Sequence, residues 1–465
     1  MQDDNLDTNF PVIEKIMAAE GLPPVAIATF KYYYKQLLNG ISGHIAESEI
    51  IPVETLPDVT AFDRSLRAAG REAVAATVVI RLNGGLGTSM GLSRAKSLIE
   101  VKNGLSFLDI IAHQAISSGT PLLLMNSFAT RDDSLAVLKQ YPELDVFDIP
   151  SDFIQHKVPK ISSEDMQPVR YPRAPHLEWC PPGHGDIFTA LVTSGVLDAL
   201  LTAGYRYAFI SNADNLGACL DETILGYLVT QHCPFLMEVA DRTEADSKGG
   251  HLARRPDGQL ILRESAQCPA DDRAAFQDIS RHKYFNTNNL WLDLRALQEI
   301  MAERGNILGL PLICNAKPVD PTNENSTRVY QLETAMGSAI AVIDGARAVR
   351  VPRTRFAPVK TTNDLLLVRS DAYALTDSYQ LRPASAAGTD PHIELDDRYY
   401  RTLDDFCARF AHGIPSLASC RQLTVIGDVK FGANIRLQGV VRIVNQSASQ
   451  ALLEHNSVLA GEVRF

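Results

Sequence analysis

A glycine-rich run, NGGLGTSMGLSRAKS at residues 83–97, directly follows the apolar run AATVVIRL. Glycines let the backbone approach a ligand closely, and the N–H groups they expose can bind an anion. Thr88 and Ser89 add hydroxyl groups, and Arg94 and Lys96 supply positive charge at the far end of the run. Backbone donors, hydroxyls and cations placed after a buried strand predict a phosphate-binding loop.

Two common sequence motifs of phosphate-binding loops do not match this run. A Walker A loop has a glycine immediately before its lysine, but Ala95 precedes Lys96. The dinucleotide fingerprint would place a glycine where Met90 stands. The readings as an ATPase and as a Rossmann dehydrogenase therefore lose most of their support. A glycine-rich βα turn with a solvated lysine is the alternative without a ligand.

A second group of polar residues, SNADN at 211–215, follows the apolar run YAFI. A carboxylate at the carboxyl end of a parallel strand lies where α/β sheets bind ligands. Mg²⁺ prefers one or two carboxylates together with phosphate and water, so Asp214 is a candidate for such an ion. Asn212 can hydrogen-bond sugar hydroxyls. The alternative is an ordinary Asn/Asp turn.

The run LNGGLGTSMG, followed by Lys96 and Ser97, resembles the signature loop of the eukaryotic-type UTP–glucose-1-phosphate uridylyltransferases, or UDP-glucose pyrophosphorylases. In the broader clan of sugar-nucleotide pyrophosphorylases an arginine stands at the place of Ser89 and a proline at that of Ala95. Further blocks agree with the family and occur in its order: FIQHKVPKI, WCPPGHGDIF, KGGHL, LRESAQCP, YFNTNNLW and RTRFAPVKTTNDLL. Between the last two, LETAMGSAI (332–340) is interpreted as a packing helix in the core.

The resemblance implies that UTP and glucose 1-phosphate give UDP-glucose and pyrophosphate by direct in-line attack on the α-phosphate. It assigns Lys96 and Lys360 to catalysis and Asp214 to Mg²⁺. A carboxamide offers both a donor and an acceptor to the edge of uracil, which suits the base-reading role implied for Gln155. The implied nucleotide-binding residues are Leu82, Gly84, Gly85, Gln155 and Gly183. The implied sugar-phosphate-binding residues are His184, Asn212, Gly250, Glu264, Asn286 and Asn288.

Two other functions remain open at this point. One is a uridylyltransferase for another sugar 1-phosphate, such as that of galactose or N-acetylglucosamine, because hydroxyl stereochemistry cannot be read from a chain. The other is a catalytically inactive sugar-nucleotide sensor on the same fold, against which the presence of both lysines and Asp214 speaks.

Composition limits the class of protein. A net charge of -11 argues against a general nucleic-acid binder, because such binding needs a basic surface. Seven cysteines stand singly, without a CxxC pair, as in a reduced cytosolic enzyme. The acidic start MQDDNLDTNF resembles no secretion signal, and no uncharged apolar run approaches the ~18 residues of a membrane span. A cytoplasmic protein is expected, with neither nucleic acid nor membrane among its partners.

The elements that must position these residues follow from hydrophobic periodicity. Residues 1–74 are predicted to be helical and to pack on the core, with Pro23 and Pro24 as a break. Residues 75–380 alternate between buried strands and helices. This predicts an α/β fold, a three-layer mixed, mostly parallel nucleotidyltransferase sheet that is Rossmann-like or GT-A-like. This region, 75–380, is expected to carry the nucleotide and sugar sites.

The tail, 381–465, shows a different pattern. Apolar residues alternate there, and Gly427, Gly432 and Gly439 recur roughly every six residues. This pattern predicts stacked β-rungs in a left-handed β-helix-like domain, with an ordinary β-meander as the alternative. Unpaired strand edges at the end of such a stack make a homo-oligomer through this domain an open expectation.

Overall fold

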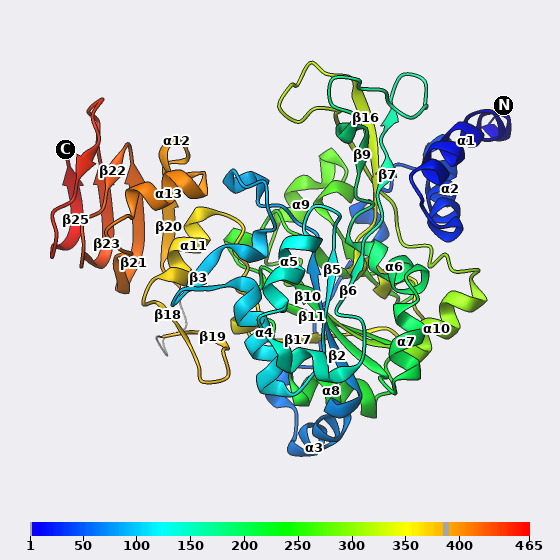
Figure 1. Ribbon diagram of the computed structural model, residues 1–465, viewed down its shortest axis with the longest axis horizontal. Helices are drawn as coiled ribbons and strands as arrows, with labels where there is room; N and C mark the ends of the chain where they lie inside the picture. Colours follow the sequence, from blue (N-terminus) through cyan, green and yellow to red (C-terminus); the bar gives the residue numbers. More distant parts are fainter. Residues whose placement is uncertain (1, 385–389) are drawn as a thin grey trace.

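The computed structural model describes residues 2–384 and 390–465 of the chain, without the side chains of residues 2–5, 7 and 8. Residues 385–389 of the predicted C-terminal domain therefore lie outside the described part. Figure 1 shows a central α/β body, with the N-terminal helices at one end of the long axis and the C-terminal strands at the other.

Helices cover both faces of the central sheet (Figure 1). The proline break lies between α1 and α2, and Ser106 and Asp109 form a capping box at the start of α4. The α-helices are α1 (Gln2–Ala19), α2 (Pro24–Leu38), α3 (Arg64–Ala73), α4 (Phe107–Ser118), α5 (Arg131–Leu138), α6 (Ile187–Thr193), α7 (Val196–Thr202), α8 (Glu222–Thr230), α9 (Arg273–Gln277), α10 (Leu294–Glu303), α11 (Thr362–Arg369), α12 (Asp397–Tyr400) and α13 (Leu403–Arg409).

The main sheet is mixed, and its centre is parallel. β2 pairs in parallel with β5 and β10, and β14 runs antiparallel to β10 and β11. The path is β1-β12-β14-β10-β2-β5-β6, with β11, β13 and β17 attached beside it. These strands are β1 (Ile51–Pro52), β2 (Thr77–Asn83), β5 (Leu122–Asn126), β6 (Asp152–Ile154), β10 (Tyr207–Asn212), β11 (Phe235–Asp241), β12 (His251–Arg254), β13 (Leu260–Arg263), β14 (Tyr284–Asp293) and β17 (Arg347–Arg350).

Small sheets lie around the main one. A three-stranded sheet has the order β15-β16-β8, and the two-stranded sheets β3–β4, β7–β9 and β18–β19 complete the body. Their strands are β3 (Glu100–Lys102), β4 (Leu105–Ser106), β7 (Val158–Pro159), β8 (Ile161–Ser162), β9 (Trp179–Cys180), β15 (Ile313–Pro318), β16 (Arg328–Glu333), β18 (Tyr373–Leu375) and β19 (Leu381–Pro383). The mixed α/β architecture predicted from the sequence is confirmed.

Alternation along β2 divides the core into two layers, because successive side chains of a strand point to opposite faces. Val78 and Ile80 belong to the cluster that contains α6, α7 and α10. Val79 belongs to the other cluster, which contains α4 and α8 and continues into the C-terminal strands. Arg81 shares the face of Val79, because its guanidinium reaches α4.

The C-terminal strands form parallel ladders. Their order is β20-β21-β23-β25, with β22 paired to β24. The predicted inward residues from Leu423 to Leu437 are buried, and Gly427 and Gly439 have positive φ. The strands are β20 (His392–Leu395), β21 (Ser416–Ile426), β22 (Val429–Lys430), β23 (Arg436–Val444), β24 (Ala451–Leu452) and β25 (Val458–Arg464).

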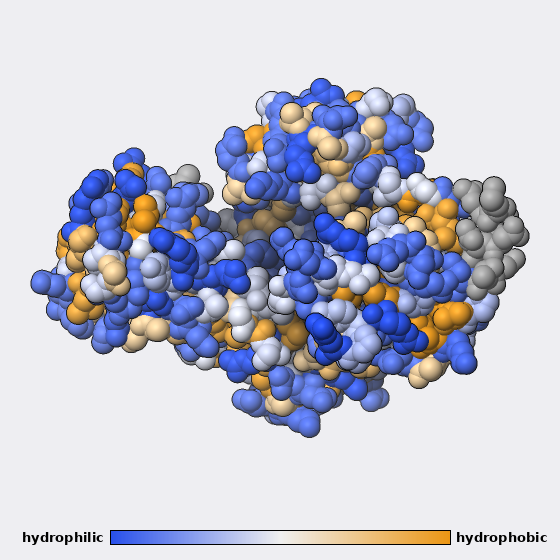
Figure 2. All heavy atoms as spheres, turned by 90° about the horizontal axis from the view of Figure 1, so that it is seen from above, coloured by the Kyte–Doolittle hydropathy of each residue, from blue (hydrophilic) through white to orange (hydrophobic). Residues whose placement is uncertain are grey.

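The surface is mostly hydrophilic on the face shown in Figure 2, which is hollowed between the C-terminal lobe at the left and the rest of the molecule. Among the described residues, no single helix is long and apolar enough to cross a bilayer. The segments His184–Thr193 and Val196–Thr202 meet that criterion only together, with a bend of 66° between them.

Candidate active site

The glycine-rich loop and the SNADN segment are neighbours because the strands that precede them are neighbours. In the parallel ladder of β2 and β10, Leu82 lies opposite Asn212, and both strands end at this edge. The N–H of Ala213 donates to the carbonyl of Leu82 at 3.1 Å, which holds the two chain exits together. Segments more than a hundred residues apart in sequence therefore form one edge of the sheet, where α/β folds bind ligands.

Asp214 is the meeting point of the two predicted catalytic lysines. The ammonium of Lys96 donates to Asp214 Oδ2 at 2.7 Å, and that of Lys360 donates to the same oxygen at 2.8 Å. The Lys96 side chain is 15% exposed and that of Lys360 56%, so one cation is enclosed and the other faces solvent. The structure thus brings together three residues predicted from three separate blocks.

Two opposing effects determine the pKa of Asp214. Burial works to raise the pKa of Asp214, but the positive charges of Lys360 and Lys96 outweigh it and hold the pKa below its usual value. Asp214 Oδ1 is buried and has no hydrogen-bond partner. Such an atom costs free energy unless a ligand satisfies it, so the free oxygen is a candidate contact for a bound ligand.

The glycine loop bends back so that Lys96 reaches Asp214. The N–H of Lys96 donates to the carbonyl of Gly85 at 3.1 Å, and Leu86 forms a β-bridge with Ala95. Gly91 has a φ of +77°, a backbone conformation that glycine adopts at low cost. These bonds close the predicted loop and place Lys96 at its end, next to Asp214.

Lys360 is carried by an extended segment that is bonded to the residue after Asp214. The amide of Asn215 donates to the carbonyl of Arg355 at 3.2 Å and accepts from the N–H of Ala357 at 2.9 Å. The N–H of Val359 donates to the carbonyl of Asp214 at 3.1 Å. This backbone attachment fixes the distance from Lys360 to the carboxylate.

A buried ion pair supports that attachment and was missed from the sequence. Arg355 donates to Glu238 on β11 through two nitrogens, at 2.7 and 2.6 Å, and Glu238 is fully buried. Burial works against the charge of Arg355, yet pairing with Glu238 keeps the pKa of the guanidinium above its usual value. Trp291 and Asn289 on β14 also donate to Glu238. The only sequence signal for Arg355 was its place beside the VKTT block.

The predicted base reader lies against the glycine loop. A Cβ added to Gly84 would come within 2.7–2.8 Å of the carboxamide of Gln155, so only glycine leaves room for that side chain. The N–H of Gln155 donates to the carbonyl of Asn126 at the end of β5. Gly85, in contrast, has nothing within 4 Å of its added Cβ and faces open space.

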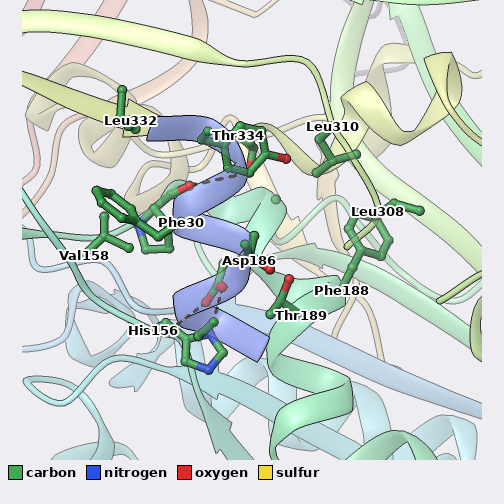
Figure 3. Close-up of a pocket in the computed structure, with 15 residues that line it drawn as sticks. Phe30, His156, Val158, Asp186, Phe188, Thr189, Leu308, Leu310, Leu332 and Thr334 are labelled. Carbon is green, nitrogen blue, oxygen red and sulfur yellow. Dashed lines mark hydrogen bonds and ion pairs between the residues drawn. The ribbon is translucent and has the colours of Figure 1, made fainter. Parts of the chain in front are cut away.

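The residue after Gln155 is clamped by the PPGHGD block. The N–H and Nδ1 of His156 lie 2.7 and 2.8 Å from the two carboxylate oxygens of Asp186 (Figure 3). Both residues line a small cavity of about 30 Å³ beneath α2. Because His156 follows Gln155 directly, this clamp joins the base-reading segment to the loop that carries Gly183 and His184.

His184 is held by a segment whose conformation differs from the prediction. Residues 332–340 are buried as expected, but they form the end of β16 and a 3₁₀ helix, Met336–Ala341, rather than a packing helix. The N–H of Met336 donates to His184 Nδ1 at 2.9 Å. Burial and then the charge of Lys360 lower the pKa of His184 to about 4, so the ring is neutral at pH 7 and carries its proton on Nε2.

This 3₁₀ helix also reaches the predicted sugar side. A Cβ on Gly337 would come within 3.0 Å of Asn286 Nδ2, and Asn286 Nδ2 donates to Asn288 Oδ1 at 2.9 Å. A register shift in the ladder of β11 and β14 between Glu238 and Val239 places this asparagine pair at an irregularity, with Asn288 at a φ of +57°. Irregular strand positions of this kind re-aim side chains and are common beside active sites.

Gly250 and Glu264 form the other half of the sugar side. A Cβ on Gly250 would come within 2.5 Å of the carboxylate of Glu264, so the glycine makes room for the carboxyl group. Burial alone raises the pKa of Glu264 to about 7. A carboxyl group without a cation beside it can accept or donate hydrogen bonds near neutral pH.

The predicted residues thus fall into two groups. Lys96, Lys360 and Asp214 share direct contacts at the phosphate end, and Gln155 packs on Gly84 near them. Contacts join Gly250, Glu264, Asn286 and Asn288, and His184 connects to them through the 3₁₀ helix. Within the described part of the chain, no hydrogen bond joins Gln155 to the sugar-side residues. Asn212 lies at the end of β10 beside Leu82, between the two groups.

Comparisons with known proteins find similar proteins over most of the chain. The family model for UTP–glucose-1-phosphate uridylyltransferase matches residues 27–438. The enzyme of that name from Solanum tuberosum is 42% identical over 394 residues, which cover 83% of this chain and 80% of the relative. The open and closed structures of UDP-glucose pyrophosphorylase from Leishmania major are 43% identical, with a TM-score of 0.91 over 98% of this chain and 99% of that one. A mutant of the Leishmania protein, solved in complex with UDP-glucose, is similar with a TM-score of 0.90 and the same identity and coverage.

Proposed function

Because the chain belongs to the UTP–glucose-1-phosphate uridylyltransferase family, we propose that its site joins UTP and glucose 1-phosphate to give UDP-glucose and pyrophosphate. The observation that carries the proposal is the convergence of two ammonium groups on one carboxylate oxygen beside a glycine-rich loop. The reaction brings together two anions, so a site for it must concentrate positive charge without a covalent nucleophile.

The chemistry needs positioning rather than proton transfer. A phosphate oxygen of the sugar phosphate attacks the α-phosphorus of UTP and forms the new P–O bond. The bond from that phosphorus to the oxygen bridging the α- and β-phosphates breaks, and its electrons leave with pyrophosphate. A phosphate monoester, with a second pKa of about 6, is largely ionised at neutral pH and needs no general base. Holding the two anions in line therefore supplies much of the rate.

Lys96 and Lys360 would neutralise charge that grows on the oxygens during transfer. Each ammonium has three N–H donors, and the contact with Asp214 uses one of them. Both lysines can therefore keep their bond to Asp214 while they donate to phosphate oxygens. Holding the lysines in place before the substrate arrives makes this stabilisation effective.

We also propose that Mg²⁺ is the cofactor and that Asp214 holds it. The described residues contain no group of three or more His, Cys, Asp or Glu side chains able to hold a metal ion alone. They do contain the unpartnered, buried Oδ1 of Asp214, which fits an ion that takes most of its ligands from phosphate and water. When bound, Mg²⁺ would offset negative charge on the phosphate oxygens.

The remaining residues would select the substrates. Gln155 would pair with the edge of uracil, and the backbone around Leu82, Gly84, Gly85 and Gly183 would approach the nucleotide closely. On the sugar side, polar groups that pair with hydroxyls discriminate strongly, because a substrate lacking a hydroxyl leaves a buried partner unpaired. That role is proposed for the sugar-side residues, which are His184, Asn212, Gly250, Glu264, Asn286 and Asn288.

For the rest of the chain we propose a division at residues 74 and 380 and a left-handed β-helix in 381–465. The parallel pairing of β21 with β23 and of β23 with β25 supports stacked rungs. β25 lies at the end of the four-stranded order, which leaves an edge for association of identical copies. A cytoplasmic location is consistent with the free cysteines.

Pyrophosphate release tests the proposed reaction directly. The protein is incubated with UTP, Mg²⁺ and one sugar phosphate at a time: the 1-phosphates of glucose, galactose and N-acetylglucosamine. We expect release to be fastest with glucose 1-phosphate. Faster release with either of the other two would assign a different sugar substrate, and no release with any of them would favour the inactive sensor.

A further inference from the structure

Arg81 is a charged residue in the core, on the face of β2 that packs against α4. It lies on β2, is 2% exposed and points between the sheet and α4. Its guanidinium donates to the hydroxyl of Ser211, to Gln114 Oε1 at 3.2 Å and to the carbonyl of Ala218 at 2.6 Å. All three acceptors are neutral, and Arg81 Nε has no partner.

The positive charge of Arg81 is therefore not balanced by an acid. Within the described residues, the titratable groups that influence its pKa are the thiol of Cys219, which burial keeps neutral at pH 7, and a second cation, Arg355. Of the three other buried arginines in the described part of the chain, Arg263 lies within 3.0 Å of both Glu47 and Asp272, and Arg355 is paired with Glu238. Arg242 donates to backbone carbonyls, and the charges of Asp246 and Asp278 act to raise its pKa. An unpaired buried charge carries a desolvation cost, which a bound counter-ion offsets.

A cavity adjoins this unpaired charge. It has a volume of about 180 Å³, whereas one water molecule occupies ~30 Å³ of liquid, so it can hold a small ion together with water. Its polar lining consists of Arg81, Gln114, Ser117, Ser118, Ser378 and Gln380, with Cys219 beside them, and no acidic residue contributes. At its rim, Gln380 accepts from the guanidinium of Arg382 at 2.7 Å, which adds a second cation.

We propose that this cavity binds a small inorganic oxyanion of the phosphate or sulfate class, with Arg81 as its counter-ion. Arg81 lines the cavity, and a guanidinium matches the geometry of such an anion. The protein as a whole carries a net charge of -11, so an anion would be drawn here by a local charge and not by the overall field. The site is separate from the proposed reaction, because none of the residues that line the cavity is among those proposed for the reaction.

The position of the site would couple it to Asp214. Arg81 is bonded to Ser211 and Ala218, which lie on either side of Asp214 in the chain. Arg355 donates to the carbonyl of Cys219 at 2.9 Å. An anion bound to Arg81 would therefore stabilise the position of the segment that carries Asp214.

Crystals grown in selenate, an analogue of sulfate whose selenium scatters anomalously, test occupancy directly. We expect an anomalous peak in the cavity within hydrogen-bond distance of Arg81. Water alone at that position, in crystals whose bulk solvent contains tens of millimolar selenate, would overturn the proposal. The active site is a separate position in the same map, so occupancy of one site is not mistaken for occupancy of the other.

Two variants that supply an internal carboxylate test binding in solution. Gln114→Glu places a carboxylate where Gln114 Oε1 already meets Arg81, and Ser117→Asp places one at an exposed residue of the cavity wall. Sulfate is expected to raise the Tm of the wild type by about 2–4 °C more than that of either variant. Sulfate stabilises folded proteins in general, so the difference between proteins is the readout and not the absolute rise.

Gln140→Glu is the matched control, because it makes the same charge change at an exposed position. It is expected to respond to sulfate as the wild type does. Gln114→Glu also loses the bond from Gln114 Nε2 to the carbonyl of Tyr379, so its folding is checked by circular dichroism. Ser117→Asp disturbs no buried bond and decides the outcome if Gln114→Glu is unstable. Equal sulfate responses in the wild type and Ser117→Asp would overturn the proposal even if the crystal shows a peak.

Discussion

The phosphate end and the sugar end of the site treat buried charge in opposite ways. At the phosphate end, Asp214 is ionised because two ammonium groups touch one of its oxygens. At the sugar end, burial raises the pKa of Glu264 to about 7, with no cation to oppose it. In the proposed function, the first arrangement would keep cations in place for an anionic substrate. The second would keep a carboxyl group close to its pKa beside a neutral part of the substrate.

The difference indicates which end depends on electrostatics and which on shape. Charges that are already paired need little reorganisation when phosphates arrive, so their effect should fall on the rate of transfer. Hydrogen bonds to sugar hydroxyls form in the ground state and in the transition state alike. Their loss should fall mainly on KM, with a smaller effect on kcat.

Asp214→Asn should give the largest effect, because it removes the shared anchor of both lysines and the proposed Mg²⁺ ligand together. We expect kcat to fall by about 10³ and to lose its normal dependence on Mg²⁺ concentration. The measurement is kcat across a Mg²⁺ titration. Asp364→Asn is the control, since it also removes a carboxylate bonded to the Lys360 backbone, while asparagine preserves the helix cap. An unchanged Mg²⁺ response in Asp214→Asn would remove Asp214 as the metal ligand.

Substitution of each lysine by methionine should lower kcat slightly less than Asp214→Asn does. We expect kcat to fall by about 10²–10³ for Lys96→Met and for Lys360→Met. Because both ammonium groups touch the same oxygen, the double variant should lose less than the product of the two single losses. The exposed Lys317→Met serves as control. Strictly multiplicative losses would show that the two lysines act on separate parts of the substrate.

These lysines also show what the sequence could predict. Lys96, Asp214 and Lys360 each stand in a short contiguous block, and such blocks encode local strand–loop structure. Because parallel strands end at the same edge of a sheet, the convergence of their loops could be expected as well. The mixed sheet and the buried residues of the C-terminal strands followed from periodicity in the same way.

What the sequence could not predict depends on partners distant in the chain. Arg355 and Glu238 are 117 residues apart, and only the register of β11 beside β14 brings Trp291 and Asn289 to the same carboxylate. Arg81 stood in an apolar strand, and no local pattern signalled a buried guanidinium without an acid. The segment 332–340 was misinterpreted because a buried apolar pattern does not distinguish a 3₁₀ turn from an α-helix.

Beside the phosphate end, Gln155 offers a smaller and more specific test. Gln155→Ala should lower the preference for UTP over CTP about 10-fold, measured as the ratio of kcat/KM values. Gly84→Ala should act in the same direction, because its new Cβ would displace the Gln155 carboxamide. In a Gln155→Ala background, Gly84→Ala should then change the ratio little. An unchanged ratio in Gln155→Ala would remove this residue as the base reader.

The smallest expected effect is the pH dependence of KM, which reports on the sugar end. As pH rises through about 7, Glu264 ionises, and an ionised acceptor makes the stronger hydrogen bond to a sugar hydroxyl. KM for glucose 1-phosphate should therefore fall by about 3-fold across this range, with little change in kcat. The phosphate of the substrate also titrates, so the readout is the ratio of wild-type KM to that of Glu264→Gln, which cannot ionise. A ratio independent of pH would contradict a titrating role for Glu264.

The same pKa has a consequence for stability, and its sign is fixed. The pKa of Glu264 is higher in the folded protein than the 4.5 of the free side chain, so between these values the folded state binds more protons than the unfolded state. The free energy of unfolding should therefore fall as pH rises from about 4.5 to about 7, relative to Glu264→Gln. Urea unfolding at several pH values measures this difference. A wild type that gains stability over Glu264→Gln in that window would show that a cation offsets the burial of Glu264, and the sugar end would then resemble the phosphate end.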